Sequence, residues 1–275
     1  MGKFDGYLLV TDLDGTLLRD DKSVSEENLR AIQEFQREGG LFSFVTGRIP
    51  RGARVVVDTV GPNAPCGHGN GGCIYDHRER RLLWGRTLPP EAKDIAAHVL
   101  SQFPSLGIIL CTTDDSYFHA RNEATAKYCR DEGYAHVERD MATVTEPILK
   151  MMFVHADEGV LRSVMAFLEA YPPARDYSFI RSDEMYYEML PRGACKGDLI
   201  PILAELTGVP VERIVAVGDN DNDASMLRAA GRGLAVANAS EAAKAAADEI
   251  TVSNREHALA AIIREWKFIA FEGSV

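Results

Sequence analysis

Two aspartates separated by one residue, Asp12 and Asp14, closely follow the apolar residues 7–10. In an extended segment, residues two apart point to the same side, so both carboxylates can face one cavity. Two carboxylates so close repel each other. A divalent cation would remove much of that repulsion, and we expect proximity and desolvation to raise the pKa of the carboxyl that the metal does not hold. One acid could then act as a nucleophile or ligand while the other carries a proton. The alternative is an acidic turn that ends a strand.

A second acidic segment, residues 219–223, comes directly after the apolar residues 214–217 and Gly218. It contains three carboxylates and two amides, a concentration that would repel itself without a cation. Because hard oxygen ligands suit magnesium, the segment predicts a Mg²⁺ site.

A calcium-binding loop is the first rival interpretation of this segment. The segment departs from such a loop at two positions, because Ala224 replaces the required glycine and Ala230 stands where the bidentate glutamate should be. A solvated loop without a ligand is the other alternative.

Two further residues could hold a phosphate group. Thr46 follows the apolar residues 41–45, and its hydroxyl could bind a phosphoryl oxygen without adding negative charge. Lys196 precedes a helical stretch and could pair with both a phosphate and the nucleophilic aspartate. Taken alone, the first could be a capping threonine and the second an ordinary surface charge.

Three short apolar runs, residues 7–10, 41–45 and 214–217, each end in polar residues. Uniformly apolar runs of this length are typical of strands buried on both faces. Between the first two runs, Ser23 and Glu26 have the spacing of a capping box and predict a helix. Strand, helix and strand imply parallel pairing, and open parallel sheets bind ligands beyond the carboxyl ends of their strands. We therefore expect the polar ends to form one site.

The sequence pattern changes between about residue 82 and residue 190, where helical stretches are separated by short strand-like runs. We expect an α/β protein with a Rossmann-like parallel-sheet core, residues 1–82 and 190–275, and an inserted α+β cap, residues 83–189. The expected cap helices span 90–103, 124–132 and 157–171, and the expected strands span 107–112, 150–156, 177–180 and 185–190.

Composition excludes several classes of function. The 275 residues are 46% hydrophobic, enough for a full core, and the formal net charge of −11 argues against a nucleic-acid binder. The five cysteines are odd in number and lack CxxC spacing, so neither a disulfide framework nor a zinc site is expected. The apolar run near the amino terminus is too short for a signal peptide or membrane span, and we expect a cytoplasmic, reduced protein with no membrane partner.

Taken in chain order, four motifs resemble those of the haloacid dehalogenase-like phosphatases. The match is nearest to the Cof-type branch (subclass IIB), although Gly72 and residues 255–257 depart from its usual pattern. The four motifs are Asp12-Leu13-Asp14-Gly15-Thr16-Leu17, Phe44-Val45-Thr46-Gly47-Arg48, Lys196-Gly197 and Gly218-Asp219-Asn220-Asp221-Asn222-Asp223, and the branch is indicated by Asn70-Gly71-Gly72, Met226-Leu227 and Val236-Ala237-Asn238-Ala239.

The resemblance implies a role for each matching residue. Asp12 resembles the nucleophile that forms an aspartyl phosphate, and Asp14 resembles the general acid that later activates water. The implied Mg²⁺ ligands are Asp12, the backbone carbonyl of Asp14 and Asp219, with Asp223 or Asn222 in support. The implied phosphate and substrate site consists of Thr46, Gly47, Arg48, Asn70 and Lys196.

The resemblance also implies a substrate class, small phosphorylated metabolites such as sugar phosphates, and a monomer or small homo-oligomer. A phosphoryl transferase or phosphomutase with the same intermediate, or a non-catalytic phosphate-binding protein, remains an alternative. A signalling receiver is excluded by the chain length and by the position of its acceptor aspartate. The cap should read the rest of the substrate, and its candidate residues are Asp114, Asp115, His119, Arg121, Arg181, Asp183 and Tyr187.

Overall fold

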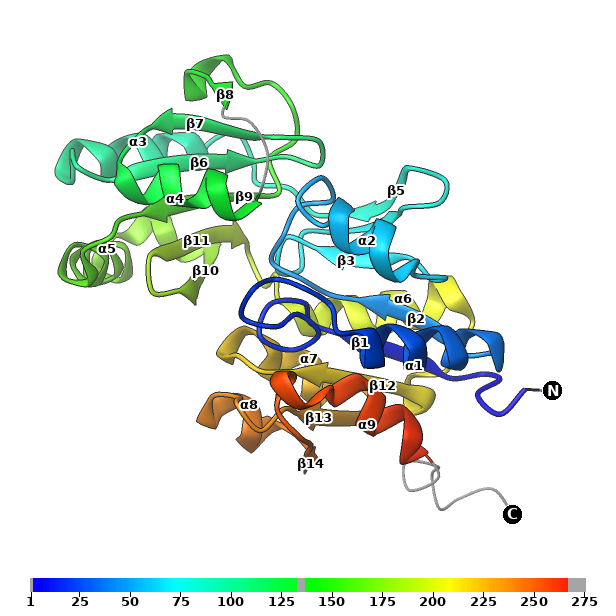
Figure 1. The fold of residues 1–275 in the computed structure, drawn as a ribbon. Helices are drawn as coiled ribbons and strands as arrows, with labels where there is room; N and C mark the ends of the chain where they lie inside the picture. Colours follow the sequence, from blue (N-terminus) through cyan, green and yellow to red (C-terminus); the bar gives the residue numbers. More distant parts are fainter. Residues whose placement is uncertain (1, 133–136, 267–275) are drawn as a thin grey trace.

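The computed structural model describes residues 2–132 and 137–266 and shows two lobes (Figure 1). One lobe contains a five-stranded sheet with the order β14-β13-β12-β1-β2, and every pairing in it is parallel. This confirms the predicted α/β class with a parallel sheet. Its strands are β1 (Leu8–Thr11), β2 (Leu41–Phe44), β12 (Ile214–Gly218), β13 (Arg232–Ala235) and β14 (Glu249–Ile250).

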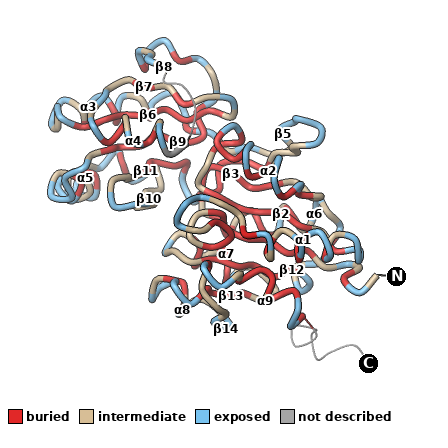
Figure 2. The backbone as a smooth tube through the Cα atoms, viewed as in Figure 1, coloured by how far each residue is buried: buried red, intermediate tan, exposed pale blue. Residues whose placement is uncertain are grey.

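The central strands are buried because helices cover both faces of this sheet. Every residue of β1 and β12 is buried, and both strands lie in the buried centre of the lobe in Figure 2. Uniform burial explains why the two strands are continuous apolar runs rather than alternating ones. The surrounding helices are α1 (Glu26–Arg37), α2 (Arg54–Val60), α6 (Leu199–Thr207), α7 (Ala224–Ala229), α8 (Glu241–Ala246) and α9 (Ala258–Arg264).

The start of α1 differs from the prediction. The N-cap is Ser25, whose hydroxyl accepts a hydrogen bond from the backbone N–H of Asn28, and not Ser23. The backbone N–H and hydroxyl of Ser23 are both bonded to Asp21 in the preceding turn. The predicted capping box between Ser23 and Glu26 is therefore wrong, because a serine nearer to the helix has the extended backbone that a cap requires.

A small antiparallel sheet, with the order β3-β4-β5, was not predicted. It continues from the parallel sheet through a bridge between Val45 and Gly67. Its strands are short, and β3 and β5 contain glycine, so they carry no clear pattern of alternation. The predicted boundary after residue 82 falls within its last strand. The strands are β3 (Cys66–His68), β4 (Cys73–Asp76) and β5 (Arg81–Gly85).

The inserted lobe contains a six-stranded sheet with the order β10-β11-β9-β6-β7-β8, which is antiparallel except between β7 and β8. The expected helices and strands of this region are present, with ends shifted by a few residues. The predicted elements are α3 (Ala92–Gln102), β6 (Gly107–Cys111), α4 (Glu123–Glu132), β9 (Lys150–Val154), α5 (Glu158–Ala170), β10 (Tyr177–Asp183) and β11 (Tyr186–Pro191). Two further strands, β7 (Ser116–Ala120) and β8 (Val137–Glu138), lie outside the strand ranges expected from the sequence.

Alternation along β9 gives the inserted sheet two different faces. Met151 and Phe153 pack with α3 and α5 in one apolar cluster. Met152 and Val154 belong to another cluster, which contains α4 residues and Ile49 of the core lobe. The second face is therefore the one that approaches the core. In the described part of the chain, none of the helices has both the length and the apolar character needed to cross a bilayer.

Candidate active site

Asp12 and Lys196 form a buried ion pair at the carboxyl end of β1. The backbone N–H of Asp12 donates to the carbonyl of Val217 in the neighbouring strand (2.8 Å), which fixes where the carboxylate leaves the sheet. Lys196 begins the 3₁₀ turn Lys196–Asp198, directly before α6. Its Nζ lies 2.7 Å from a carboxylate oxygen of Asp12, and the side chains are only 1% and 8% exposed. The fold thus brings together two groups that are 184 positions apart in the sequence.

The acidic segment after β12 completes the cluster. Asp223 accepts hydrogen bonds from the backbone N–H groups of Asp219 (3.0 Å) and Asn220 (2.9 Å), and its other oxygen is bonded to Lys196. One carboxylate oxygen from each of Asp12, Asp219 and Asp223 lies within 4.8 Å of the others. Three acids and one lysine therefore share a small buried volume.

Gly15 permits the close approach of Asp219 to the loop after β1. The φ angle of Gly15 is +84°, in the left-handed region that favours glycine. A Cβ atom at this position would lie 2.3 Å from the Oδ2 of Asp219. The hydroxyl of Thr16 donates to the other oxygen of Asp219 at 2.6 Å. The loop therefore both makes room for this carboxylate and orients it.

The cluster contains three carboxyl groups and one lysine, and burial and mutual repulsion shift their pKa values. Burial raises the pKa of Asp12 well above its usual value, and Asp223 and Asp219 add to this while Lys196 opposes it. Burial and the charge of Asp223 raise the pKa of Asp219 to about 6. Burial disfavours charge on Lys196, but the neighbouring carboxylates raise its pKa above the usual value. A divalent cation would relieve this repulsion, so the residues fit a metal ion.

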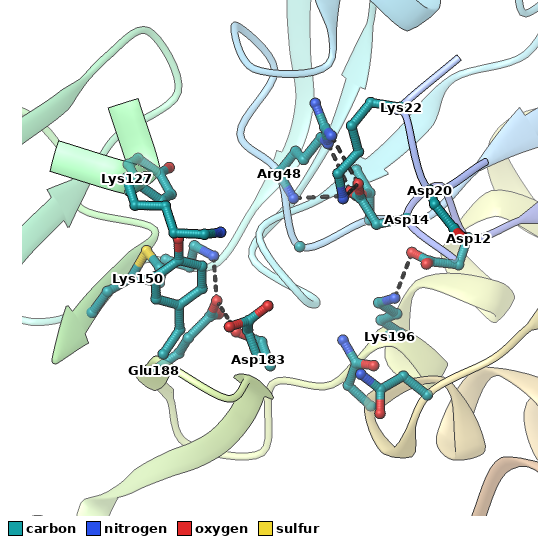
Figure 3. Close-up of a pocket in the computed structure, with 18 of the residues that line it drawn as sticks. Asp12, Asp14, Asp20, Lys22, Arg48, Lys127, Lys150, Asp183, Glu188 and Lys196 are labelled. Carbon is teal, nitrogen blue, oxygen red and sulfur yellow. Dashed lines mark hydrogen bonds and ion pairs between the residues drawn. The ribbon is translucent and has the colours of Figure 1, made fainter. Parts of the chain in front are cut away.

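Asp14 contradicts the electrostatic expectation. Burial acts to raise the pKa of Asp14, but hydrogen bonds and charge from Arg48 and Lys22 outweigh it and hold the pKa far below its usual value. The Nε and Nη2 of Arg48 each donate to one carboxylate oxygen of Asp14 at 2.8 Å, and the Nζ of Lys22 lies 2.8 Å from the Oδ1 of Asp14. The carboxyl expected to retain a proton therefore has a lowered pKa in this structure, because Lys22 of the same loop and Arg48, 34 residues away, both face it (Figure 3).

The remaining predicted site residues lie beside the cluster. Thr46 is buried and borders the main cavity, and its hydroxyl accepts from the backbone N–H of Arg48 at 3.2 Å. A Cβ atom on Gly47 would lie 3.0 Å from the side chain of Asn70. Asn70 itself is fully buried, accepts from Asn222 (3.0 Å) and donates to Glu188 (2.8 Å). Its amide therefore links the acidic segment to the inserted lobe.

A cavity of about 440 Å³ opens between the two lobes, above Asp12 and Lys196. On the inserted lobe it is bordered by Lys150, whose Nζ lies 2.7 Å from Glu188, and by Ser182, which donates to the same carboxylate at 2.7 Å. Figure 3 shows Lys150 and Glu188 across the cavity from Asp14. Residues that sequence reasoning missed here are Asp20, Asp21, Lys22, Lys127, Tyr128, Lys150, Met152, Ser182, Tyr186, Glu188 and Asn220.

Some of these residues carried a usable signal. Lys150 and Glu188 are charged residues within apolar strands, a placement that is rare without a partner. Of the seven cap residues singled out from the sequence, Asp183 borders this cavity. Tyr187 points to the opposite face of its strand, where it stacks on Phe179 with ring centres 5.5 Å apart. Five more of the seven do not border the catalytic cavity: Asp114, Asp115, His119, Arg121 and Arg181.

Known proteins resemble this chain over almost its whole length. The family model described as haloacid dehalogenase-like hydrolase matches residues 9–263. A Bacillus subtilis (strain 168) protein named phosphatase YwpJ is 29% identical, over 94% of this chain and 98% of its own length. Another from the same strain, named 5-amino-6-(5-phospho-D-ribitylamino)uracil phosphatase YitU, is 28% identical over 94% of this chain and 97% of its own.

Solved structures show the same fold. The crystal structure of a haloacid dehalogenase-like hydrolase from Bacteroides thetaiotaomicron superposes with a TM-score of 0.86 at 27% identity, covering 96% of this chain and all of the other. A Thermotoga maritima structure gives a TM-score of 0.81 at 25% identity, over 94% and 97% of the two chains. The family resemblance inferred from the four motifs is therefore confirmed.

Proposed function

Because this chain belongs to the haloacid dehalogenase-like hydrolase family, we propose that it is a Mg²⁺-dependent phosphatase that cleaves small phosphorylated metabolites through an aspartyl phosphate on Asp12. The buried ion pair between Asp12 and Lys196 at the base of the cavity is the observation that carries the proposal. A carboxylate held by a cation at the closed end of a cavity can attack a phosphorus atom while the cation holds the phosphoryl oxygens.

The residues that would hold Mg²⁺ are Asp12, Asp219 and the backbone carbonyl of Asp14. Asn222 could add an oxygen, since its buried Oδ1 has no hydrogen-bond partner among the described residues. Both oxygens of Asp223 already accept hydrogen bonds, so this residue is better suited to orienting Lys196 and the backbone of the segment. When bound, the ion would offset negative charge on the phosphoryl group.

In the proposed reaction, an oxygen of Asp12 attacks phosphorus and the bond to the leaving oxygen breaks. Asp14 gives a proton to the leaving oxygen and then takes one from the water that cleaves the acyl phosphate. Thr46 and Lys196 hold the phosphoryl oxygens. Since Asp14 is ionised by Arg48 and Lys22 in this structure, these cations must release it before it can carry a proton. Substrate binding would draw them away.

The substrate class is part of the proposal. The cavity volume of about 440 Å³ lies within the usual range for small-molecule sites. Tyr128 and Tyr186 border it, with ring centres 5.8 Å apart in an edge-to-face arrangement, and the Lys150–Glu188 pair supplies donors and acceptors for hydroxyl groups. We propose sugar or polyol phosphates. Because three Bacillus subtilis relatives are named as 5-amino-6-(5-phospho-D-ribitylamino)uracil phosphatases, that compound belongs in the first screen.

Asp12→Asn tests the proposal. With an aryl phosphate and Mg²⁺, we expect this variant to release phosphate at least roughly a thousandfold more slowly than the wild type, with an unchanged circular dichroism spectrum. Asp21→Asn, which removes a carboxylate from the rim of the same cavity, should retain most activity. Appreciable turnover by Asp12→Asn would rule out Asp12 as the nucleophile. Conversion of a sugar phosphate to its isomer without free phosphate would instead favour a phosphomutase.

A further inference from the structure

A second cavity, of about 350 Å³, shares no lining residue with the catalytic one. It lies between the loop before α2, the end of β4 and the turn that joins β6 to β7, so both lobes contribute to it (Figure 1). Arg51 of the loop forms an ion pair with Asp115 of that turn at 2.6 Å. A molecule in this cavity would contact both lobes without touching Asp12.

The charges around this cavity favour an anion. Three arginines, Arg51, Arg54 and Arg80, border it, against Asp58 and Asp114. Arg54 approaches Asp58 only to 3.9 Å, and Arg80 makes no hydrogen bond or ion pair within the described ranges of the chain. Such a cluster stands out in a chain whose formal net charge is −11. The guanidinium fork matches the oxygens of carboxylates and phosphates.

Two histidines connect the wall of this cavity to the catalytic loop. The Nδ1 of His68 lies 3.2 Å from the carbonyl of Arg48, and its Nε2 lies 3.0 Å from the Nε2 of His77, which borders the cavity. A carbonyl only accepts, so Nδ1 of His68 donates. Burial, reinforced by His77, keeps the pKa of His68 far below its usual value, so the ring is neutral and its Nε2 accepts from His77.

This chain of hydrogen bonds fixes the tautomer of His77. With its proton on Nε2, the neutral ring has an acceptor at Nδ1, and no described residue donates to that atom. The ring of Tyr75 lies beside it, with centres 5.0 Å apart, and adds a flat wall. The cavity therefore offers several cationic donors together with acceptors at His77, Asp58 and Asp114. An anion that also carries a hydroxyl or amino group would satisfy both.

Arg48 lies between the two cavities. Its carbonyl accepts from His68, while its guanidinium holds Asp14 and donates to the carbonyl of Gly52 at 3.2 Å. Arg51 lies three residues further along the same loop and borders the second cavity. A ligand that shifts this loop therefore acts on Arg48, whose guanidinium donates to both carboxylate oxygens of Asp14 in the catalytic cavity.

We propose that the second cavity binds a small metabolite that carries a carboxylate or phosphate group together with a hydroxyl or amino group, and that the bound ligand changes catalysis through the Arg48 loop. The catalytic part of this proposal rests on the proposed phosphatase function. The binding part does not, because it can be measured without turnover.

Calorimetric titration of the full chain at constant free Mg²⁺ tests the site with two probes, malate and inorganic phosphate. The double variant Arg54→Ala/Arg80→Ala removes two exposed guanidinium groups and should weaken binding of at least one probe tenfold or more. Arg78→Ala, an exposed arginine in the same turn as Arg80 that does not border the cavity, is the matched control and should bind like the wild type. If the double variant loses affinity for malate alone, the ligand is a carboxylate. If it loses affinity for phosphate alone, the ligand carries a phosphate group.

The same proteins test the coupling. The probe that loses affinity should change kcat/KM for an aryl phosphate at least twofold more in the wild type than in the double variant at the same concentration, because any competition at the catalytic cavity is the same in both proteins. Equal affinity of both probes for the wild type and the double variant would overturn the site. Weaker binding to the double variant with the same effect of the ligand on kcat/KM in both proteins would overturn the coupling to Arg48 and leave only the site.

Discussion

Replacing Lys150 with methionine should destabilise the protein strongly. The side chains of Lys150 and Glu188 are 4% and 2% exposed, and their charged groups lie 2.7 Å apart. Removing the lysine leaves a buried carboxylate whose remaining donors, among residues 2–132 and 137–266, are the neutral side chains of Ser182 and Asn70. Breaking a buried pair in this way typically costs about 3–5 kcal/mol. That is a large part of the total stability of about 5–15 kcal/mol expected for a folded domain.

Urea unfolding followed by circular dichroism measures this loss. Adding Glu188→Gln to Lys150→Met removes the unpaired charge while keeping an oxygen for Ser182, so the double variant should recover about 2 kcal/mol. Arg30→Met provides the comparison, because Arg30 and Glu26 are 74% and 78% exposed and such pairs contribute less than about 1 kcal/mol. A loss below about 1 kcal/mol for Lys150→Met, or no recovery in the double variant, would refute the reasoning.

Three further predictions concern the loop after β1, the metal and the histidine pair. Gly15→Ala should lower kcat/KM at least tenfold, about 1.4 kcal/mol, because its Cβ would collide with Asp219, whereas Gly61→Ala, also at positive φ but with no atom within 4 Å, should not. Mg²⁺ at roughly one hundred times its Kd should stabilise the wild type by about 2.7 kcal/mol in thermal unfolding, and activity that survives chelation would contradict a metal-dependent reaction. Burial lowers the pKa of His77 to about 4 from 6.5, so its contribution to stability is present above pH 6.5 and is lost as the pH falls towards 4. We expect the free energy of unfolding, measured by urea titration, to fall by about 2 kcal/mol less for His77→Gln than for the wild type between pH 6.5 and pH 4, after a discount for partial exposure. The same pH dependence of unfolding in both proteins would contradict a neutral histidine pair.

The parallel core could be predicted because its signal is local. Leu8–Thr11 and Ile214–Gly218 are continuous apolar strands because both faces of the sheet are covered, and that condition is visible in each segment separately. The small sheet β3-β4-β5 could not be predicted in the same way. Its strands are held by pairing with one another and with the end of β2, and their residues show no comparable pattern.

The lining of the cavity on the inserted lobe depends on register. Tyr186 and Glu188 face the catalytic cavity, while Tyr187 between them stacks on the opposite face of the sheet. A shift of one residue would exchange these positions, and only the pairing with neighbouring strands fixes the alternative that occurs. The sequence pattern therefore predicted a cap over the crevice but not which of its side chains would contact a substrate.

The sequence alone indicated candidate groups for the chemistry, because Asp12, Asp14 and Asp219 follow apolar runs and Lys196 precedes a helical stretch. Their assembly followed from the rule that the carboxyl ends of parallel strands meet at one edge. The lowered pKa of Asp14 depends on the fold, because the turn of its own loop brings Lys22 to it, Arg48 reaches it from 34 residues away, and together they outweigh the effect of burial. Electrostatic energies depend on distances between charges that the fold alone sets.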